Sequence, residues 1–325
     1  MKKNIAIIMG GYSSEYEISL KSGQVVYETL QELGVYHVYK VHIFKEKWVY
    51  VTDTSEEFTI DKNDFSVTVS NKKITFHCVF NAIHGSPGED GIMQAYFKLI
   101  NMPHTSCNMY QAALTFNKRD CLSVLKPFGI KTAESYYINK GDELNEEAII
   151  NKVGLPCFVK ANRAGSSFGI TKVYKKADFK AALEIAYKED NEVIIESFLD
   201  GVEVSVGVIS YQGNTTVLPI TEIVSENDFF DYQAKYLGAS QEITPARISE
   251  EDAEKVRLIA KKIYEILKMT GFTRSEFIFK NGEPHLLEIN TVPGLTKASI
   301  LPQQAEAAGI SRAQLFQNAI NEALQ

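Results

Sequence analysis

The sequence lacks the two glycine-rich patterns by which nucleotide-binding folds are most often recognised. Its 325 residues contain no Gly-x-x-x-x-Gly-Lys-[Ser/Thr] segment and no Gly-x-Gly-x-x-Gly segment, so neither a P-loop nor a dinucleotide-binding fingerprint is present. If the chain binds a nucleotide, a different arrangement of backbone and lysine side chains must hold the phosphates.

The sequence also gives no support for a thiolate-bound metal, a secretion signal or a membrane span. The cysteines are scattered and form no Cys-x-x-Cys pair, so we expect reduced, buried thiols and no zinc site at Cys78, Cys107, Cys121 and Cys157. The apolar run at residues 5–9 is too short for a secretion signal. No stretch approaches the roughly 18 apolar residues of a membrane span. We expect a cytoplasmic protein without a membrane partner.

A surplus of basic residues is absent as well. The chain has 34 Lys and Arg against 41 Asp and Glu, which gives a net charge of -7. This balance argues against a nucleic-acid partner, which usually requires a basic face. It does not exclude a nucleotide, because a few local lysines and helix N-termini suffice to hold phosphates. At roughly 100–200 residues per domain, the length indicates two or three domains.

The first hundred residues predict an α/β domain. Residues 5–9 form a continuous apolar run, which is typical of a buried parallel strand. Residues 17–33 carry apolar side chains at helical spacing, Gly34 ends that helix, and residues 38–44 alternate like a second strand. We expect a hairpin-rich excursion over residues 45–77. The strand–helix–strand order predicts a parallel sheet.

The rest of the chain has shorter strands and helices around two notable segments. Residues 164–169 form a small-residue loop between two predicted strands. Residues 225–246 are polar, irregular and longer than most connections, which is typical of a lid over a site. A strand at residues 193–196 is taken to open the third region. We therefore divide the chain into residues 1–106, 107–192 and 193–325.

A hairpin near the C-terminus carries the strongest local signal. Glu288 and Asn290 lie two apart on a predicted strand and share a face. Hard cations such as Mg²⁺ prefer carboxylate and amide oxygens. A two-residue turn at Asn281-Gly282 would turn Glu276 away from them, whereas a three-residue loop or one bulge would place Glu276 opposite Glu288. A hairpin with only a polar outer face would have a similar sequence.

The turn sequence and a metal site favour different registers. Asn-Gly strongly favours a two-residue turn, but bound cations favour clustered carboxylates. We expect the metal site to prevail, with a three-residue loop or a bulge, and Pro284 suits a bulge or an edge strand. One face should then present four side chains, namely Arg274, Glu276, Glu288 and Asn290.

Other candidate residues are ambiguous when each is taken alone. Lys160 precedes the small-residue loop, whose backbone N–H groups could approach phosphates, but a flexible hairpin turn is the favoured interpretation of this segment taken alone. Glu196 and Glu203 could meet a nucleotide or be solvated carboxylates. His84 and Glu15 follow the ends of predicted strands, where open α/β sheets place ligands, yet a lone histidine is more often structural.

Five segments, taken in order, resemble the D-alanine–D-alanine ligases of the ATP-grasp superfamily over essentially the whole chain. They are GGxSxExExS at residues 10–19, HGxxGEDG at 84–91, GSSxG at 165–169, DYxAKY at 231–236 and ExNTxPG at 288–294. The resemblance implies an ATP-grasp fold. In that fold an N-terminal parallel-sheet, Rossmann-like domain precedes two α+β subdomains that clamp ATP.

The resemblance also implies which residues meet ATP and its metal ions. Lys118 and Lys160 would hold the ATP phosphates, with Ser167 and its loop as a lid. Glu196 and Leu199 would meet adenine, and Glu203 the ribose. Lys235 would reach the γ-phosphate. Two Mg²⁺ or Mn²⁺ ions would bind Glu276, Glu288 and Asn290. The family usually has aspartate at position 276 and proline at position 161, where this chain has glutamate and alanine.

The implied reaction joins two D-alanine molecules through an acyl phosphate and releases ADP and phosphate, for peptidoglycan precursor synthesis. A hydrogen-bonded triad of Glu15, Ser166 and Tyr236 would close over the substrates. Glu15 and His84 would meet the first D-alanine, and Ser299 and Ile300 would meet the carboxylate of the second. Arg274 and Gly294 would stabilise the tetrahedral oxyanion.

Two other functions remain open at this point. A ligase that joins D-alanine to D-lactate is the nearest, and the resemblance ties Tyr236 to an amine nucleophile instead. A non-catalytic ATP-binding regulator is the other, although a binder has no use for a second metal carboxylate. The resemblance implies a homodimer.

Overall fold

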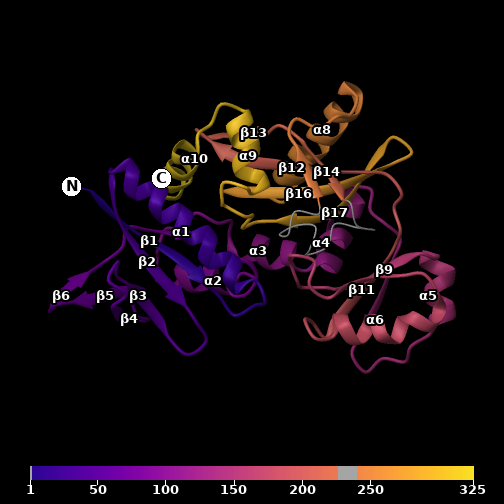
Figure 1. Cartoon of the computed structure of the whole chain (residues 1–325), viewed down its shortest axis with the longest axis horizontal. Coiled ribbons are helices and arrows are strands. Elements are labelled where there is room, and N and C mark those ends of the chain that lie inside the picture. The colour runs from indigo at the N-terminus through magenta and orange to yellow at the C-terminus, as the bar shows by residue number, and fades with distance from the viewer. Residues whose placement is uncertain (1, 226–239) are drawn as a thin grey trace.

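The computed structural model describes residues 2–225 and 240–325 (Figure 1). In these residues the strands form three sheets of seven, four and six strands, with helices packed on them in a mixed α/β arrangement. No helix in the described ranges combines the length and apolarity that crossing a bilayer requires.

The N-terminal sheet is parallel at one end, and this part confirms the predicted parallel arrangement. β1 (Lys3–Gly10) lies between β2 (Tyr36–Ile43) and β7 (Cys78–Asn81) and is parallel to both. α1 (Tyr16–Leu33) makes the crossover and ends at Gly34, whose φ of 70° is the left-handed conformation that favours glycine. The carboxyl ends of β1 and β7 therefore deliver their following loops to one edge of the sheet.

The expected hairpin-rich excursion is confirmed as an antiparallel extension of the same sheet. It comprises four strands, β3 (Trp48–Val51), β4 (Glu57–Asp61), β5 (Ser66–Val69) and β6 (Lys72–Ile74). Trp48 packs edge-on against Tyr96 of α2 (Ile92–Leu99), with ring centroids 5.3 Å apart. The excursion thus extends the first core away from the other two sheets, as Figure 1 shows.

The four-stranded sheet has the order β10-β9-β11-β8 and is antiparallel throughout. Its strands are β8 (Ser135–Asn139), β9 (Cys157–Ala161), β10 (Ile170–Val173) and β11 (Glu192–Ser197). Two helices, α5 (Glu146–Val153) and α6 (Phe179–Ala186), share one core with it after a short turn, η2 (Lys176–Asp178).

Two features of this sheet differ from the sequence analysis. β8 and α5 were not predicted. β11, which was taken to open the third region, instead lies between β9 and β8. The reason is packing, because Val193 and Ile195 enter the same core as Val159.

The six-stranded sheet contains the rest of the strands. They are β12 (Val202–Tyr211), β13 (Asn214–Val217), β14 (Thr221–Ser225), β15 (Ser240–Ile243), β16 (Phe272–Lys280) and β17 (Glu283–Asn290). α8 (Glu250–Ile266) packs on one face, and the Ser249 hydroxyl caps it by accepting from the Asp252 N–H at 3.1 Å.

The register of the β16–β17 hairpin confirms the expected bulge. Lys280 pairs with Glu283 across a two-residue Asn281-Gly282 turn, yet Glu276 pairs with Glu288 because the register shifts between them. The turn residues have φ of 54° and 74°, the left-handed pair that the turn requires. The hairpin therefore has both the two-residue turn that Asn-Gly favours and Glu276 opposite Glu288, because the bulge accommodates one extra residue in β17.

Shorter helices join the sheets. Two of them, α3 (Met109–Phe116) and α4 (Lys118–Leu125), are separate helices because Asn117 between them is extended and caps the second. A short turn, η1 (Lys126–Phe128), follows. The chain ends with two helices that were not predicted, α9 (Ile300–Ala307) and α10 (Arg312–Ala323).

The last helix packs on the first sheet. Phe316 of α10 is fully buried and contacts Phe80 of β7 edge-on, with ring centroids 5.5 Å apart. Figure 1 shows α10 beside α1 and β1, although almost the whole sequence separates them. The two ends of the chain therefore share a core, and this brings the segment after β17 against the loops of the N-terminal sheet.

We expect Phe316→Ala to lower the free energy of unfolding by about 3–5 kcal/mol, because it removes a buried ring from the core that joins the two ends of the chain. Urea unfolding would measure this. Phe128→Ala is the matched control, since Phe128 is 48% exposed, and it should change stability by less than about 0.5 kcal/mol. Equal effects of the two changes would contradict the packing described.

Candidate active site

Two adjoining cavities gather the candidate residues. The larger, of about 380 Å³, lies between the four- and six-stranded sheets and contains Lys118, Lys160, Ser167, Glu196, Leu199, Glu203, Glu276 and Glu288. The smaller, of about 140 Å³, is lined by Glu15, His84, Ser166, Arg274, Glu288, Asn290, Gly294, Ser299 and Ile300. Every predicted site residue that the structure describes therefore lines one of them, and Glu288 lines both. Lys235 and Tyr236 lie outside the described residues.

Alternate side chains on β9 and β16 face the larger cavity, while the others face the core. On β9 the odd-numbered residues face the helices, so Phe158 and Lys160 face the cavity. On β16 Phe277 enters the core beneath α8, so Glu276 and Ile278 face the cavity from the opposite side. The two sheets thus present one wall each.

The two lysines are each held by a carboxylate. Lys160 Nζ lies 2.8 Å from Glu196 Oε2, and Lys118 Nζ lies 3.0 Å from Glu288 Oε2. Burial would lower the pKa of Lys160, but Glu196, with Glu288 and Glu203, outweighs it and raises the pKa. A buried lysine that stays charged is suited to a polyanion such as a phosphate chain.

Apolar side chains also line the larger cavity. Phe158, Phe198, Leu199 and Leu287 are among them. Leu287 was not predicted, and it reaches the cavity because the bulge puts two successive residues of β17, Leu287 and Glu288, on the same side. Nearby, Glu196 Oε1 is buried with no partner in the described structure. Such an acceptor is costly unless a ligand N–H reaches it.

A cation could be held where the bulged hairpin faces both cavities. Glu276 Oε1 accepts from Arg274 Nε at 2.7 Å and Ser205 Oγ at 3.3 Å, while its Oε2 is buried with no described partner. The amide nitrogen of Asn290 is likewise without a described partner, so the amide has no bond that fixes its orientation. In the described ranges no three His, Cys, Asp or Glu side chains form a preformed metal cage. Two carboxylates and an amide suit Mg²⁺, which takes further ligands from phosphate and water.

The small-residue loop closes onto the N-terminal domain. Ser166 Oγ donates to Glu15 Oε1 at 2.5 Å. Gly165 permits this contact, because a Cβ at that position would lie 2.7 Å from Glu15 Oε2. Ser166 and Ser167 have φ of 50° and 60°, left-handed values that cost energy outside glycine and mark a functional loop. Two of the three predicted triad members are therefore in contact.

His84 uses both ring nitrogens within the protein. Its Nδ1 lies 2.7 Å from the Val292 carbonyl oxygen, which can only accept, so Nδ1 carries the hydrogen. Its Nε2 then accepts from Ser22 Oγ at 2.8 Å. Burial lowers the pKa of His84, and nearby Glu15 opposes this only in part. The neutral ring lines the smaller cavity while it ties α1 to the segment after β17.

Glu89 belongs to the HGxxGEDG segment, and its role follows from contacts that the sequence does not predict. Its carboxylate accepts the backbone N–H of Gly85 at 2.9 Å, of Thr291 at 3.2 Å and of Val292 at 3.1 Å. Burial, followed by the charge of Glu15, raises the pKa of Glu89 to about 7. Glu89 thus joins the loop after β7 to the segment after β17, a role that no local pattern could reveal.

The N-terminus of α9 opens into the smaller cavity. Ser299 is its N-cap and Ile300 its first residue. Helix N-termini attract anions through free N–H groups and the helix dipole. Gly294 lies against this end, and a Cβ there would be 2.7 Å from Ser299 Oγ. A small carboxylate fits this arrangement.

Known families match the chain over both halves. A family described as D-ala D-ala ligase N-terminus matches residues 4–107, and one described as D-ala D-ala ligase C-terminus matches residues 124–321. The mixed α/β fold sets a lysine-bearing cavity beside a smaller cavity that ends on a helix N-terminus. The chain belongs to the D-alanine–D-alanine ligase family.

Individual relatives agree along the full length. A D-alanine–D-alanine ligase from Flavobacterium johnsoniae is 69% identical over 322 residues, covering 99% of this chain and 99% of that protein. The structure of D-alanyl-alanine synthetase A from Vibrio cholerae matches with a TM-score of 0.89 at 25% identity, covering 99% and 98% of the two chains. VanG D-Ala:D-Ser ligase from Enterococcus faecalis matches with a TM-score of 0.85 at 31% identity, covering 99% and 100%.

We expect His84→Phe to destabilise the fold by about 1–3 kcal/mol, because it leaves the Val292 carbonyl and the Ser22 hydroxyl buried without their partner. The unfolding free energy would be measured in urea. His37→Phe, at an exposed position of β2, is the control and should be nearly neutral. A His84 variant as stable as the control would show that these two bonds do not hold the domains together.

Proposed function

We infer that this enzyme joins two D-alanine molecules in an ATP-dependent reaction that passes through an acyl phosphate and releases ADP and phosphate, for peptidoglycan precursor synthesis. One observation carries the inference. The carboxylate of Glu288 lines both a lysine-bearing cavity and a smaller cavity that ends on a helix N-terminus. A nucleotide and a small carboxylate bound in these cavities would meet beside it.

We propose that the four- and six-stranded sheets form an ATP-grasp clamp behind a substrate-binding domain of residues 1–106. Supporting this, the larger cavity lies between the two sheets, each of which contributes one wall. The sequence boundary at residue 192 cuts through the sheet that contains β11. We therefore place the second subdomain at residues 107–197 and the third at residues 198–325.

ATP would lie in the larger cavity with its phosphates towards the two lysines. Lys118 and Lys160 would supply positive charge there, and Ser167 of the small-residue loop lines the same cavity. The unpartnered Glu196 Oε1 would accept an N–H of adenine beside Leu199, and Glu203 would accept from the ribose. Lys235, proposed for the γ-phosphate, lies outside the described residues.

Two Mg²⁺ or Mn²⁺ ions are proposed at Glu276, Glu288 and Asn290, where they would neutralise phosphate charge. The residues present fit this, because Glu276 Oε2 is buried and unpartnered and pairs across the hairpin with Glu288. Arg274 holds the other Glu276 oxygen at 2.7 Å. The longer glutamate therefore still presents one oxygen to the site.

The chemistry needs activation, because a carboxylate is inert toward amines. The carboxylate of the first D-alanine attacks the γ-phosphorus and ADP leaves; positioning and charge neutralisation do most of the work. The amine of the second D-alanine attacks the acyl carbon, loses a proton, and phosphate leaves. We propose that Glu15 holds the ammonium of the first substrate beside His84. The carboxylate of the second would lie at Ser299 and Ile300.

The tetrahedral oxyanion requires donors and a dry site. We propose the Arg274 guanidinium and the Gly294 N–H for this role. Water would hydrolyse the acyl phosphate, so a cover must exclude it. The contact between Ser166 and Glu15 closes one side of the smaller cavity. Tyr236 is proposed as the third member of this triad, and it lies outside the described residues.

Compartment and assembly are proposed on indirect grounds. A reaction that consumes ATP fits the cytoplasm, and D-alanine is the partner on which the enzyme acts, without nucleic acid or membrane. We propose a homodimer, as the family resemblance implies. Leu99 on α2 and Tyr110 on α3, which are 82% and 63% exposed, are apolar surface that a second copy could cover.

ADP release that depends on D-alanine separates the ligase from a non-catalytic ATP-binding regulator. We expect the wild-type chain to release one ADP per dipeptide, measured by a coupled assay and by mass spectrometry of the product. Substituting D-lactate for the second substrate should give little ester. ATP binding without D-alanine-dependent ADP release would support the regulator, and preferential ester formation would support the D-lactate ligase.

Glu288→Gln should lower turnover by about 100-fold or more, because it removes charge from the one carboxylate shared by both cavities. Steady-state rates at saturating substrates would measure the loss. Glu283→Gln on the same strand is the control, since Glu283 pairs with Lys131 at 3.1 Å away from the site. Turnover within twofold of wild type in the Glu288 variant would refute the proposed metal site.

A further inference from the structure

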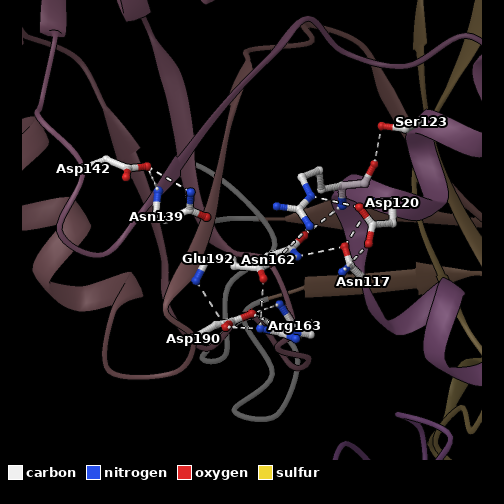
Figure 2. Close-up of polar contacts among 10 residues, drawn as sticks. Asn117, Asp120, Ser123, Asn139, Asp142, Asn162, Arg163, Asp190 and Glu192 are labelled. Atoms are coloured by element: carbon white, nitrogen blue, oxygen red, sulfur yellow. Dashed lines mark hydrogen bonds and ion pairs between the residues drawn. The ribbon is translucent and has the colours of Figure 1, made fainter.

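A polar network joins the base of the small-residue loop to α4 without lining either cavity (Figure 2). Its centre is Asn162, which follows β9 and is 1% exposed. The side-chain oxygen accepts the Arg119 N–H at 2.8 Å. The side-chain nitrogen donates to Asn117 Oδ1 at 2.8 Å and to Glu192 Oε2 at 3.0 Å. The Asn162 amide therefore makes one accepted and two donated bonds, all to other elements.

The backbone of Asn162 completes the connection. Its N–H donates to the Glu192 carbonyl at 2.9 Å, and its carbonyl accepts the Lys118 N–H at 3.3 Å. Lys118 is the first residue of α4, and Asn117 is the N-cap of that helix. One residue at the base of the loop thus fixes the start of α4 to the start of β11.

The same helix start reaches back to the loop. Lys118 Nζ donates to the Ala164 carbonyl at 2.7 Å and pairs with Glu288. Ala164 is two residues after Asn162. A closed ring of hydrogen bonds therefore connects Asn162 to the start of α4, and the Lys118 side chain connects α4 back to the loop. Its geometry sets the distance between the Lys118 amine and the loop backbone.

A second brace holds the other side of the loop base. Arg163 donates from Nε and Nη2 to the two carboxylate oxygens of Asp190, each at 2.9 Å, and its N–H also reaches Asp190 at 2.9 Å. A bidentate pair of this kind fixes orientation as well as distance. The loop therefore begins from a rigid base, although its own residues adopt left-handed conformations.

We propose that Asn162 is a positioning residue that sets the affinity for ATP by fixing the Lys118 amine relative to the small-residue loop, without touching the nucleotide. This rests on the proposed placement of ATP phosphates between that loop and Lys118. Loss of the amide should let α4 and the loop move apart. Nucleotide binding should then weaken more than D-alanine binding, because the smaller cavity takes only Ser166 from that loop and most of its other lining residues come from the N-terminal domain and the segment after β17.

Three variants test the role of the amide. Asn162→Ala removes every side-chain bond. Asn162→Asp keeps the shape but cannot donate to Asn117 or Glu192 and places two carboxylates side by side. The double variant Asn162→Asp with Glu192→Gln exchanges donor and acceptor, so that the amide at position 192 can donate to the carboxylate at position 162. It conserves the net charge. Asn139→Ala is the control, because Asn139 lies on the edge strand β8, across β11 from Asn162, and its side chain binds Asp142 (Figure 2).

We expect the Kd for a non-hydrolysable ATP analogue with Mg²⁺, measured by calorimetry on the full chain, to rise about tenfold in Asn162→Ala and Asn162→Asp. KM for ATP should rise in parallel, KM for D-alanine should stay within twofold, and the double variant should recover most of the loss. Asn139→Ala should bind the analogue like wild type.

Two outcomes would overturn the proposal. One is a variant with a lower Tm but unchanged Kd for the analogue, which would make the network merely structural. The other is an equal rise of KM for ATP and D-alanine with no rescue by the double variant. Because the calorimetric arm needs no turnover, its result stands apart from the D-alanine-dependent assay, whose failure in the wild-type chain would refute the ligase function instead.

Discussion

The bulge in β17 is the constraint on which the site depends. Before it, Leu286 enters the core beneath α8; after it, Ile289 does. The side-chain alternation therefore changes phase by one residue, and Leu287 and Glu288 both face the cavities. A regular strand would bury Glu288 and expose Ile289. One extra residue thus secures the core and sets Glu288 opposite Glu276.

Charge balance around that hairpin explains how a crowded ionic site can be stable before ligands bind. Lys118 pairs with Glu288, Lys160 with Glu196, and Arg274 with Glu276, so each buried cation has a carboxylate beside it. Unpaired buried charges would cost several kcal/mol each. On binding, ATP phosphates would replace carboxylates as partners of the lysines, and metal ions would replace the lysines and Arg274 as partners of the carboxylates. This gives a physical reason for the cavity lining to contain both lysines and carboxylates.

The smaller cavity depends on contacts between distant parts of the chain. Glu89 accepts N–H groups from both the loop after β7 and the segment after β17, and His84 bridges Ser22 and Val292. α10 reinforces this junction by packing on β7. The smaller cavity is therefore a product of the closure between the two ends of the chain.

Local sequence determined the elements with strong patterns: the parallel strand and helix that open the chain, the capped α8 and the hairpin turn at Asn281-Gly282. Ordered motifs placed the candidate residues, because phosphate, metal and carboxylate chemistry restricts the residue types that can serve. β8, α5, α9 and α10 were missed, since their short apolar patterns are settled by the surfaces they cover.

Only the tertiary structure decided that β11 lies between β9 and β8, that Leu287 joins Glu288 in the cavity, and that Glu89, His84 and Asn162 connect separate elements. These features depend on which residues meet across long sequence separations. The sequence specified the chemical groups. Packing of the three cores decided where those groups point and what they touch, because a side chain's partners are set by the whole fold.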